Sequence, residues 1–307
     1  MTNAVKMEKF TFESAADGQT LSAVAYSPKK PKGIVQLVHG MSEHVGRYEQ
    51  MMTFFAENGY VACAHDHRGH GDSVAKNDDL GYFGADGTAR ALVEDTVQFT
   101  RLMKERYPNL PVYLYGHSMG SMVVRCYIQE HDDEIEKLIV SGSPNANPFV
   151  GIAVKLAGAV KAIKGERHRS KTLKSLSTGS SEKRFPEDGD LGWLTSDKAV
   201  QQQFREDEKC GAVFTANGFQ NLFHVLKNTY DKKRYKVGNP SLPIHFVAGA
   251  EDPIIGDEKK WLYGQEMLRK VGYTDVTGKL YEGMRHEPHN EIGKEIVWQD
   301  LLDFIEK

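Results

Sequence analysis

The chain has 307 residues, a formal net charge of −3 and 40% hydrophobic residues, which is the composition of an ordinary globular protein with room for one large domain. This balance excludes a global preference for nucleic acid or anionic membranes, so any such preference needs a local patch. Cys63, Cys126 and Cys210 lie far apart, which argues against a disulfide framework and a cysteine-ligated zinc site. Residues 1–12 lack the apolar core of a signal peptide. We therefore expect a cytoplasmic protein without metal or cofactor.

Short apolar runs alternate with longer helical patterns, as is typical of a mostly parallel sheet flanked by helices. Apolar runs predict strands, in chain order, at 21–26, 33–38, 60–65, 111–115, 137–141, 244–248 and 279–281. Apolar periodicity predicts helices at 48–58, 87–106, 119–130, 258–270 and 293–305.

The alternation of strands and helices breaks between residues 144 and 231. This stretch is rich in Lys, Ser, Gly and Gln and has few β-branched apolar runs. We expect one α/β domain in two parts, 1–143 and 232–307, interrupted by a helical cap at 144–231 that covers the active site.

The strongest local signal is Gly116-His117-Ser118-Met119-Gly120, a GxSxG motif between a predicted strand and a predicted helix. Glycines two residues before and after the serine leave room for a strained strand-to-helix turn. Such a turn exposes the hydroxyl at the carboxyl end of the sheet and aims the helix N-terminus at it. The alternative is a glycine-rich turn without chemistry, but the strand and helix on either side favour Ser118 as a nucleophile.

A second signal, His39-Gly40-Met41, follows the strand predicted at 33–38. Acyl-transfer enzymes bind the developing oxyanion with two backbone N–H groups. One usually comes from the residue after the nucleophile, here Met119, and the other from the loop where Met41 lies. The alternative is that the His-Gly pair only ends the strand.

A serine hydroxyl needs a base and a group that orients the base. Enzymes with this serine turn carry the carboxylate between the serine and the histidine in the chain. Asp252 follows the strand predicted at 244–248 and therefore lies at the same sheet edge as Ser118. Glu251 and Asp257 compete with it from less favourable positions.

Two histidines are candidates for the base. His286 and His289 both lie between the last predicted strand, 279–281, and the last predicted helix. His286 is nearer the strand end and is the preferred base.

The chain resembles the monoacylglycerol lipase and lysophospholipase branch of the α/β hydrolases. The matching motifs are HGMSEHVGRY at 39–48, HDHRGHGDS at 65–73, YGHSMG at 115–120, AGAEDP at 248–253 and YEGMRHE at 281–287. The resemblance implies an eight-stranded α/β-hydrolase fold in which Ser118, Asp252 and His286 are catalytic. It also implies oxyanion N–H groups at Met41 and Met119. The usual GHSMGG of this branch reads GHSMGS here, with Ser121 as the departure.

Three other interpretations compete with a serine hydrolase. The histidine-rich segment at 65–70 contains good metal ligands but lacks the spacing of familiar metal motifs. Relatives with an aspartate nucleophile, such as dehalogenases and epoxide hydrolases, would need Asp in place of Ser118. A non-catalytic binding protein would be expected to lose one of the three catalytic residues, and this chain keeps all three.

The cap contains a predicted helix whose apolar residues recur at helical spacing in one stripe: Ile152, Leu156, Ala159, Val160 and Ile163. Between residues 155 and 174 there are seven Lys or Arg and one Glu, a local charge of +6. A basic amphipathic helix can lie at a lipid interface. The other interpretation is a helix packed on the core with a solvated charged face.

These observations predict a serine hydrolase whose substrate is a small lipid with an acyl ester. This lipid would be either a monoacylglycerol or a lysophospholipid. The alternative with the same chemistry is a carboxylesterase for short-chain or aromatic acyl esters. The basic cap helix leaves transient contact with a membrane surface open, and a nucleic-acid partner is not expected.

Overall fold

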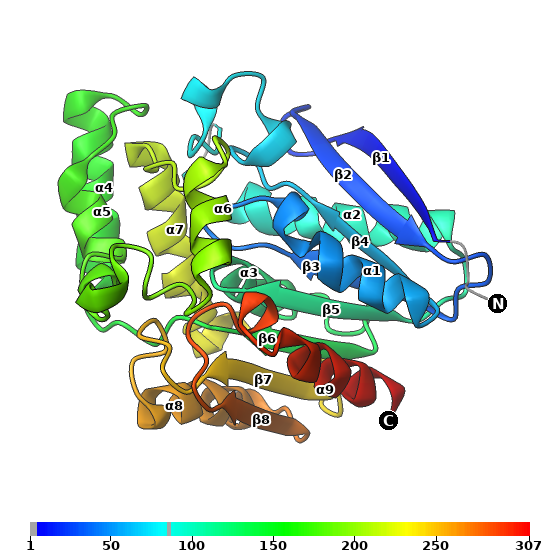
Figure 1. The fold of residues 1–307 in the computed structure, drawn as a ribbon. Helices are drawn as coiled ribbons and strands as arrows, with labels where there is room; N and C mark the ends of the chain where they lie inside the picture. The colour runs from blue at the N-terminus through cyan, green and yellow to red at the C-terminus, as the bar shows by residue number, and fades with distance from the viewer. Residues whose placement is uncertain (1–4, 85–86) are drawn as a thin grey trace.

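A mixed sheet is the framework of the computed structural model, which describes residues 5–84 and 87–307 (Figure 1). Its eight strands lie in the order β1-β2-β4-β3-β5-β6-β7-β8. β2 runs antiparallel to both of its neighbours, and all other pairs are parallel. The strands are β1 (Lys6–Glu13), β2 (Thr20–Ser27), β3 (Gly33–Val38), β4 (Tyr60–His65), β5 (Val112–His117), β6 (Lys137–Ser141), β7 (Ile244–Gly249) and β8 (Val276–Tyr281). The expected mostly parallel, eight-stranded sheet is confirmed.

Helices cover both faces of the sheet, with α1 and α9 on one face and α2, α3 and α8 on the other (Figure 1). The helices are α1 (Glu49–Glu57), α2 (Arg90–Arg106), α3 (Met119–Tyr127), α4 (Val150–Lys164), α5 (Lys171–Ser177), α6 (Lys198–Glu206), α7 (Ala216–Thr229), α8 (Glu258–Val271) and α9 (Lys294–Glu306). Every residue of β3 and β4 is buried between the two helix layers, which explains their continuous apolar sequences. Among the described helices, none has the length and apolar character needed to cross a bilayer.

Several elements differ from the sequence prediction, among them β1, α2 and α3. The edge strand β1 was missed because its sequence, KMEKFTFE, alternates charged and aromatic residues instead of forming an apolar run. α2 begins at Arg90 and not at Gly87, because Gly87 and Ala89 have left-handed φ angles of 62° and 63°. α3 ends at Tyr127, three residues earlier than predicted.

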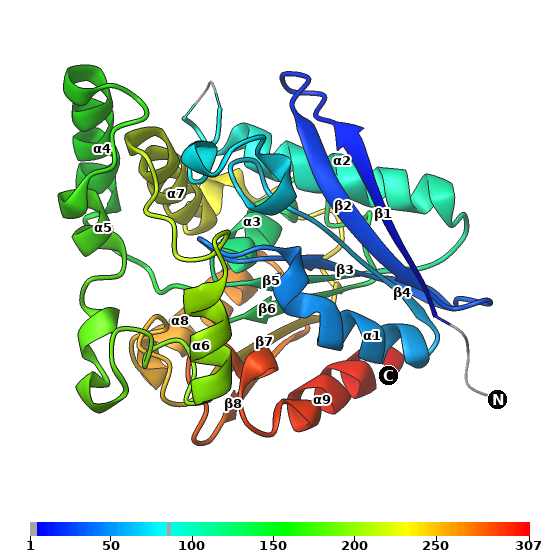
Figure 2. The same cartoon turned by 45° about the horizontal axis from the view of Figure 1, so that its top comes forward.

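Residues 144–231, called the cap segment below, carry α4 to α7 between β6 and β7. Figure 2 shows these helices gathered beyond one end of the sheet. Cap residues and core residues together line a cavity of about 700 Å³, and Ser118 lies in its wall. The cap segment therefore lies over the sheet edge at which β5 ends.

Most of the apolar stripe predicted for α4 is present but faces away from the core. Val160 packs inward, whereas Ile152 and Ile163 are 65% and 78% exposed. The buried face instead includes Ala153 and Ala157, whose small side chains let α4 lie close to α7. Because this helix is apolar on most sides, its spacing did not reveal which side faces the core.

Candidate active site

Ser118 lies on the sharp turn between β5 and α3. Its φ of 53° and ψ of −116° form a strained conformation, which costs on the order of 1–3 kcal/mol for a residue other than glycine. A Cβ atom at Gly116 would lie 2.5 Å from the carbonyl oxygen of Gly120. A Cβ atom at Gly120 would lie only 2.0 Å from the carbonyl oxygen of Val38. The predicted need for glycine at both positions is confirmed.

The structure brings Ser118, His286 and Asp252 together from three separate loops. In the neutral tautomer that fits both contacts, the Ser118 hydroxyl donates to His286 Nε2 at 2.9 Å, and His286 Nδ1 donates to Asp252 Oδ2 at 2.9 Å. The other carboxylate oxygen of Asp252 accepts the backbone N–H of Ile254 at 2.8 Å. Asp252 and His286 are buried, so water competes little for these hydrogen bonds.

The residues that compete for the roles of acid and base, Glu251, Asp257 and His289, lie away from the Ser118 hydroxyl and the His286 ring or make other contacts. The side chain of Glu251 is 49% exposed, and Asp257 caps the N-terminus of α8. The ring of His289 is stacked on Tyr48 at 4.8 Å, and its Nδ1 lies 3.2 Å from the hydroxyl of Tyr115. None of these three competitors has a hydrogen bond or ion pair to Ser118 or His286 within the described chain.

Two neighbouring imidazoles differ in their proton affinity. Burial acts to lower the pKa of His286, but the adjacent Asp252 carboxylate outweighs burial and raises this pKa above its ordinary value. Burial lowers the pKa of His289 to about 3. His286 is therefore the histidine suited to exchange a proton near neutral pH.

The loop after β3 (residues 39–43), called the oxyanion loop below, approaches Ser118 closely, since a Cβ atom at Gly40 would lie 3.1 Å from Ser118 Cβ. The N–H of Gly40 donates to Glu43 Oε1 at 2.5 Å, and the N–H of Ser42 donates to His70 Nε2 at 3.3 Å. Met41, between them, and Met119 both line the cavity. Among the described residues, neither of these methionines has an acceptor for its backbone N–H, so both groups remain available as donors.

A buried ion-pair network behind the oxyanion loop was not anticipated. The Arg47 guanidinium pairs with both carboxylate oxygens of Glu287, which is next to His286 in the chain, and with Glu43 Oε2 at 2.8 Å. Burial raises the pKa of the Glu43 carboxyl. Arg47 outweighs burial at Glu287 and lowers the pKa of that carboxyl. The network joins the oxyanion loop to the His286 loop, and its residues lie in the HGMSEHVGRY and YEGMRHE motifs, where they could have been noticed.

The cap segment also contacts the catalytic histidine candidate. The ring of Trp193 lies 5.2 Å from that of His286, and the carbonyl of Trp193 accepts the N–H of His286 at 3.4 Å. No sequence pattern pointed to Trp193, because it lies in a stretch without periodicity.

The histidine-rich segment that begins at the last residue of β4 lies beneath the oxyanion loop. His65, His67 and His70 are buried with His39, and the rings of His39 and His67 are 4.3 Å apart. Asp66, a potential metal ligand, instead accepts two backbone N–H groups, from residues 45 and 72. Within the described residues, the two groups of potential ligands close enough to share an ion lie elsewhere.

Acid is expected to destabilise the fold through this histidine cluster. Burial lowers the pKa of His65 to about 3 and that of His70 to about 4. In the unfolded chain, both side chains have their ordinary pKa of 6.5. Because these rings are neutral when folded, their stabilising contribution is complete above pH 6.5 and is lost as the pH falls toward the folded values. Each ring then lowers the free energy of unfolding by up to about 1.4 kcal/mol for each pH unit of acidification.

Urea unfolding of the wild type and of His65→Phe between pH 7 and pH 5 measures this effect. His65 packs between Phe12 and Phe99, so phenylalanine suits the site, and the variant should lose less stability on acidification. Equal losses in the two proteins would show that His65 does not contribute to acid sensitivity.

A sheet of this order, with a serine on the tight turn after β5 and a histidine after β8, is the framework of the α/β hydrolases, and the protein is a serine hydrolase of this type. More narrowly, the chain belongs to the family described as serine aminopeptidase S33, which matches residues 29–293. The resemblance to the monoacylglycerol lipase and lysophospholipase branch is confirmed by the relatives.

Three relatives illustrate this similarity. A monoglyceride lipase homologue of Monkeypox virus is 38% identical over 286 residues, covering 90% of each chain. Phospholipase YtpA of Bacillus subtilis (strain 168) is 30% identical over 284 residues, covering 91% of this chain and 96% of its own. The crystal structure of a highly thermostable carboxyl esterase from Bacillus coagulans, in complex with glycerol, has a TM-score of 0.88 at 26% identity and covers 99% of both chains.

Proposed function

We propose that this protein hydrolyses esters of lipids that carry one medium or long acyl chain, such as a monoacylglycerol or a lysophospholipid. The observation that carries the proposal is the relay of Ser118, His286 and Asp252 at the wall of a cavity of about 700 Å³. This volume lies within the range of about 300–1,000 Å³ typical of small-molecule sites. The names of the relatives, a monoglyceride lipase homologue and a phospholipase, agree with this substrate class.

The proposed reaction has two steps. Ser118 Oγ attacks the ester carbonyl carbon while His286 Nε2 takes its proton, and Asp252 stabilises the resulting imidazolium. The N–H groups of Met41 and Met119 bind the oxyanion. The imidazolium then returns its proton to the departing alkoxide, which leaves as the alcohol.

Water completes the cycle by attacking the acyl-serine. His286 takes a proton from this water and later gives it to Ser118 Oγ, so the fatty acid leaves and the free enzyme is restored.

The exposed apolar and basic side chains of the cap segment favour a lipid substrate. The cavity includes the exposed apolar side chains of Phe149, Ile152, Leu156 and Leu176, which are 69%, 65%, 37% and 53% accessible. Monomeric proteins rarely expose large apolar patches without a binding role. Together with the +6 charge at 155–174, this rim suits transient contact with an anionic lipid surface and entry of an acyl chain. We propose that residues 144–231 act as the cap that admits this chain.

A chain-length series tests the substrate class. Hydrolysis of glycerol monoesters from C2 to C18 should show the highest kcat/KM between C12 and C18, because each buried methylene contributes about 0.8 kcal/mol. A maximum at C2–C4 would contradict the lipid proposal and favour the short-chain carboxylesterase.

A variant of the exposed face of α4 tests whether the cap contacts a lipid surface. The double variant Ile152→Ser/Ile163→Ser should lose activity on a C16 monoester in anionic vesicles and keep activity on a dissolved C4 ester. Equal loss on both substrates would indicate damage to the active site, and no loss on either would exclude surface contact through α4.

A further inference from the structure

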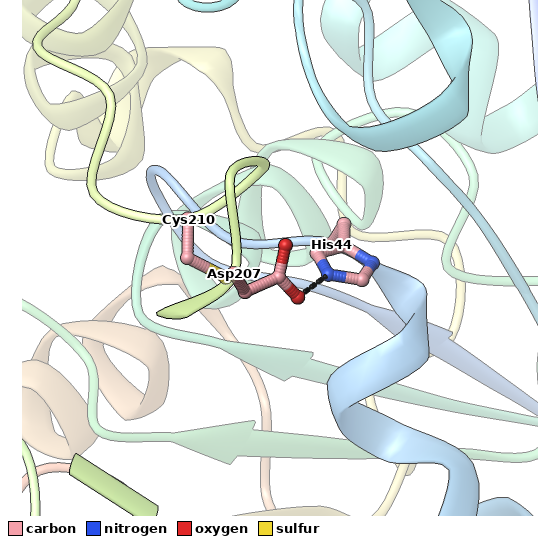
Figure 3. A group of neighbouring side chains, drawn as sticks. All are labelled: His44, Asp207 and Cys210. Carbon is pink, nitrogen blue, oxygen red and sulfur yellow. Dashed lines mark hydrogen bonds and ion pairs between the residues drawn. The ribbon is translucent and has the colours of Figure 1, made fainter. Parts of the chain in front are cut away.

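A histidine, an aspartate and a cysteine meet where the cap segment touches the oxyanion loop (Figure 3). One ligand atom from each of His44, Asp207 and Cys210 lies within 4.8 Å of the other two. His44 follows the oxyanion loop, while Asp207 and Cys210 lie in the turn after α6. We infer that this cluster is a binding site for a thiophilic divalent cation such as Zn²⁺, which would bridge the cap segment and the oxyanion loop.

The side chains have the right chemistry for such an ion. Imidazole nitrogen, carboxylate oxygen and thiolate sulfur are the three ligand types that zinc binds in proteins, and three protein ligands leave one position for water. His44, Asp207 and Cys210 are only partly buried, so an ion can reach them from solvent. The second cluster of potential ligands, Glu43, His117 and Glu287, is fully buried, and both of its carboxylates are already paired with Arg47.

For the His44–Asp207 pair the geometry requires only a small adjustment. His44 Nδ1 accepts the N–H of Gly46 at 3.2 Å, so Nε2 carries the proton and donates to Asp207 Oδ2 at 2.7 Å. Two ligand atoms on a tetrahedral zinc ion are about 3.3 Å apart, so the ion would replace this proton and move the pair apart by roughly 0.6 Å. The Asp207 side chain is 33% exposed and has room to move, and the long hydrogen bond from Gly46 would be given up.

The backbone on both sides already holds the two segments together. The N–H of Gly211 donates to the carbonyl of Ser42 at 2.8 Å, and the Ser42 hydroxyl donates to the carbonyl of Ala212 at 2.8 Å. Little chain entropy is therefore lost when an ion joins the same segments.

The charge around the cluster also permits a cation. Two nearby basic side chains are already paired, Lys209 with Asp72 and Arg47 with two carboxylates. Burial raises the pKa of the Cys210 thiol, so metal binding would release a proton and strengthen as the pH rises. The sequence did not suggest this site because His44 and Asp207 are 163 residues apart.

Anaerobic titration with Co²⁺ tests the inference. The wild type should bind one equivalent and develop a near-ultraviolet sulfur-to-cobalt charge-transfer band. Cys210→Ser should lose the band, and His44→Gln and Asp207→Asn should weaken binding by at least the 10–100-fold that loss of an outer-shell partner costs. Zn²⁺ should displace Co²⁺ and raise the melting temperature of the wild type but not of Cys210→Ser.

The matched control is His131→Gln. His131 pairs with Glu134 at 3.3 Å on the surface, which is a histidine–carboxylate pair without a thiol. This variant should titrate like the wild type. Circular dichroism confirms that each variant is folded, so the result is independent of ester hydrolysis. Absence of the band in folded wild type, or its persistence in Cys210→Ser, would overturn the inference.

Discussion

Replacement of Ser118 by alanine is expected to lower kcat for ester hydrolysis by about 10⁶, to the background rate of the assay. The change removes the hydroxyl that donates to His286 Nε2, and the neighbouring glycines and N–H groups stay in place. The melting temperature should change little, because alanine occupies the same turn with one atom fewer. A fluorophosphonate probe followed by mass spectrometry should label Ser118 in the wild type and no residue in the variant.

Ser121→Ala is the matched control for this experiment. Its hydroxyl donates to the carbonyl of Ser118 at 2.5 Å, on the same turn, but it does not reach His286. This variant should keep its labelling at Ser118 and most of its activity. If the fluorophosphonate instead labelled another residue in folded Ser118→Ala, the proposed nucleophile would be wrong.

The variant Asp252→Asn is expected to lower kcat by about 10⁴. An amide in this place no longer stabilises the imidazolium, and its NH₂ group can hold His286 in the wrong tautomer. The pH profile should change as well. Asp252 raises the pKa of His286 against the effect of burial, so its neutralisation lowers that pKa. His286 must be neutral to act as a base, so the acid limb of kcat/KM should move to lower pH.

Glu251→Gln distinguishes a specific role for Asp252 from a general effect of charge. It removes a carboxylate at the adjacent position, one that is half exposed and 3.9 Å from Arg285. This variant should keep kcat within a few fold and retain the acid limb of the wild type. A loss in Glu251→Gln as large as that in Asp252→Asn would contradict the assignment of the acid.

Much of the fold could be predicted because its signals are local. The continuous apolar sequences of β3 and β4 reflect burial on both faces, and they were recognised without tertiary information. The edge strand β1 could not be found in this way, because its outer residues face solvent. A different limit applies to α4, because a helix that is apolar on most of its circumference does not reveal by its spacing which side faces the core.

The sequence by itself determined the serine turn, because five consecutive residues specify its geometry and Gly116 and Gly120 leave no space for a side chain. Only the tertiary structure decided which candidates lie near Ser118, what Arg47 pairs with, and how Trp193 reaches His286. These contacts join segments far apart in the chain: Arg47 and Glu287 are 240 residues apart. Their geometry depends on how the cap and the loops pack, and no local pattern of residues encodes that packing.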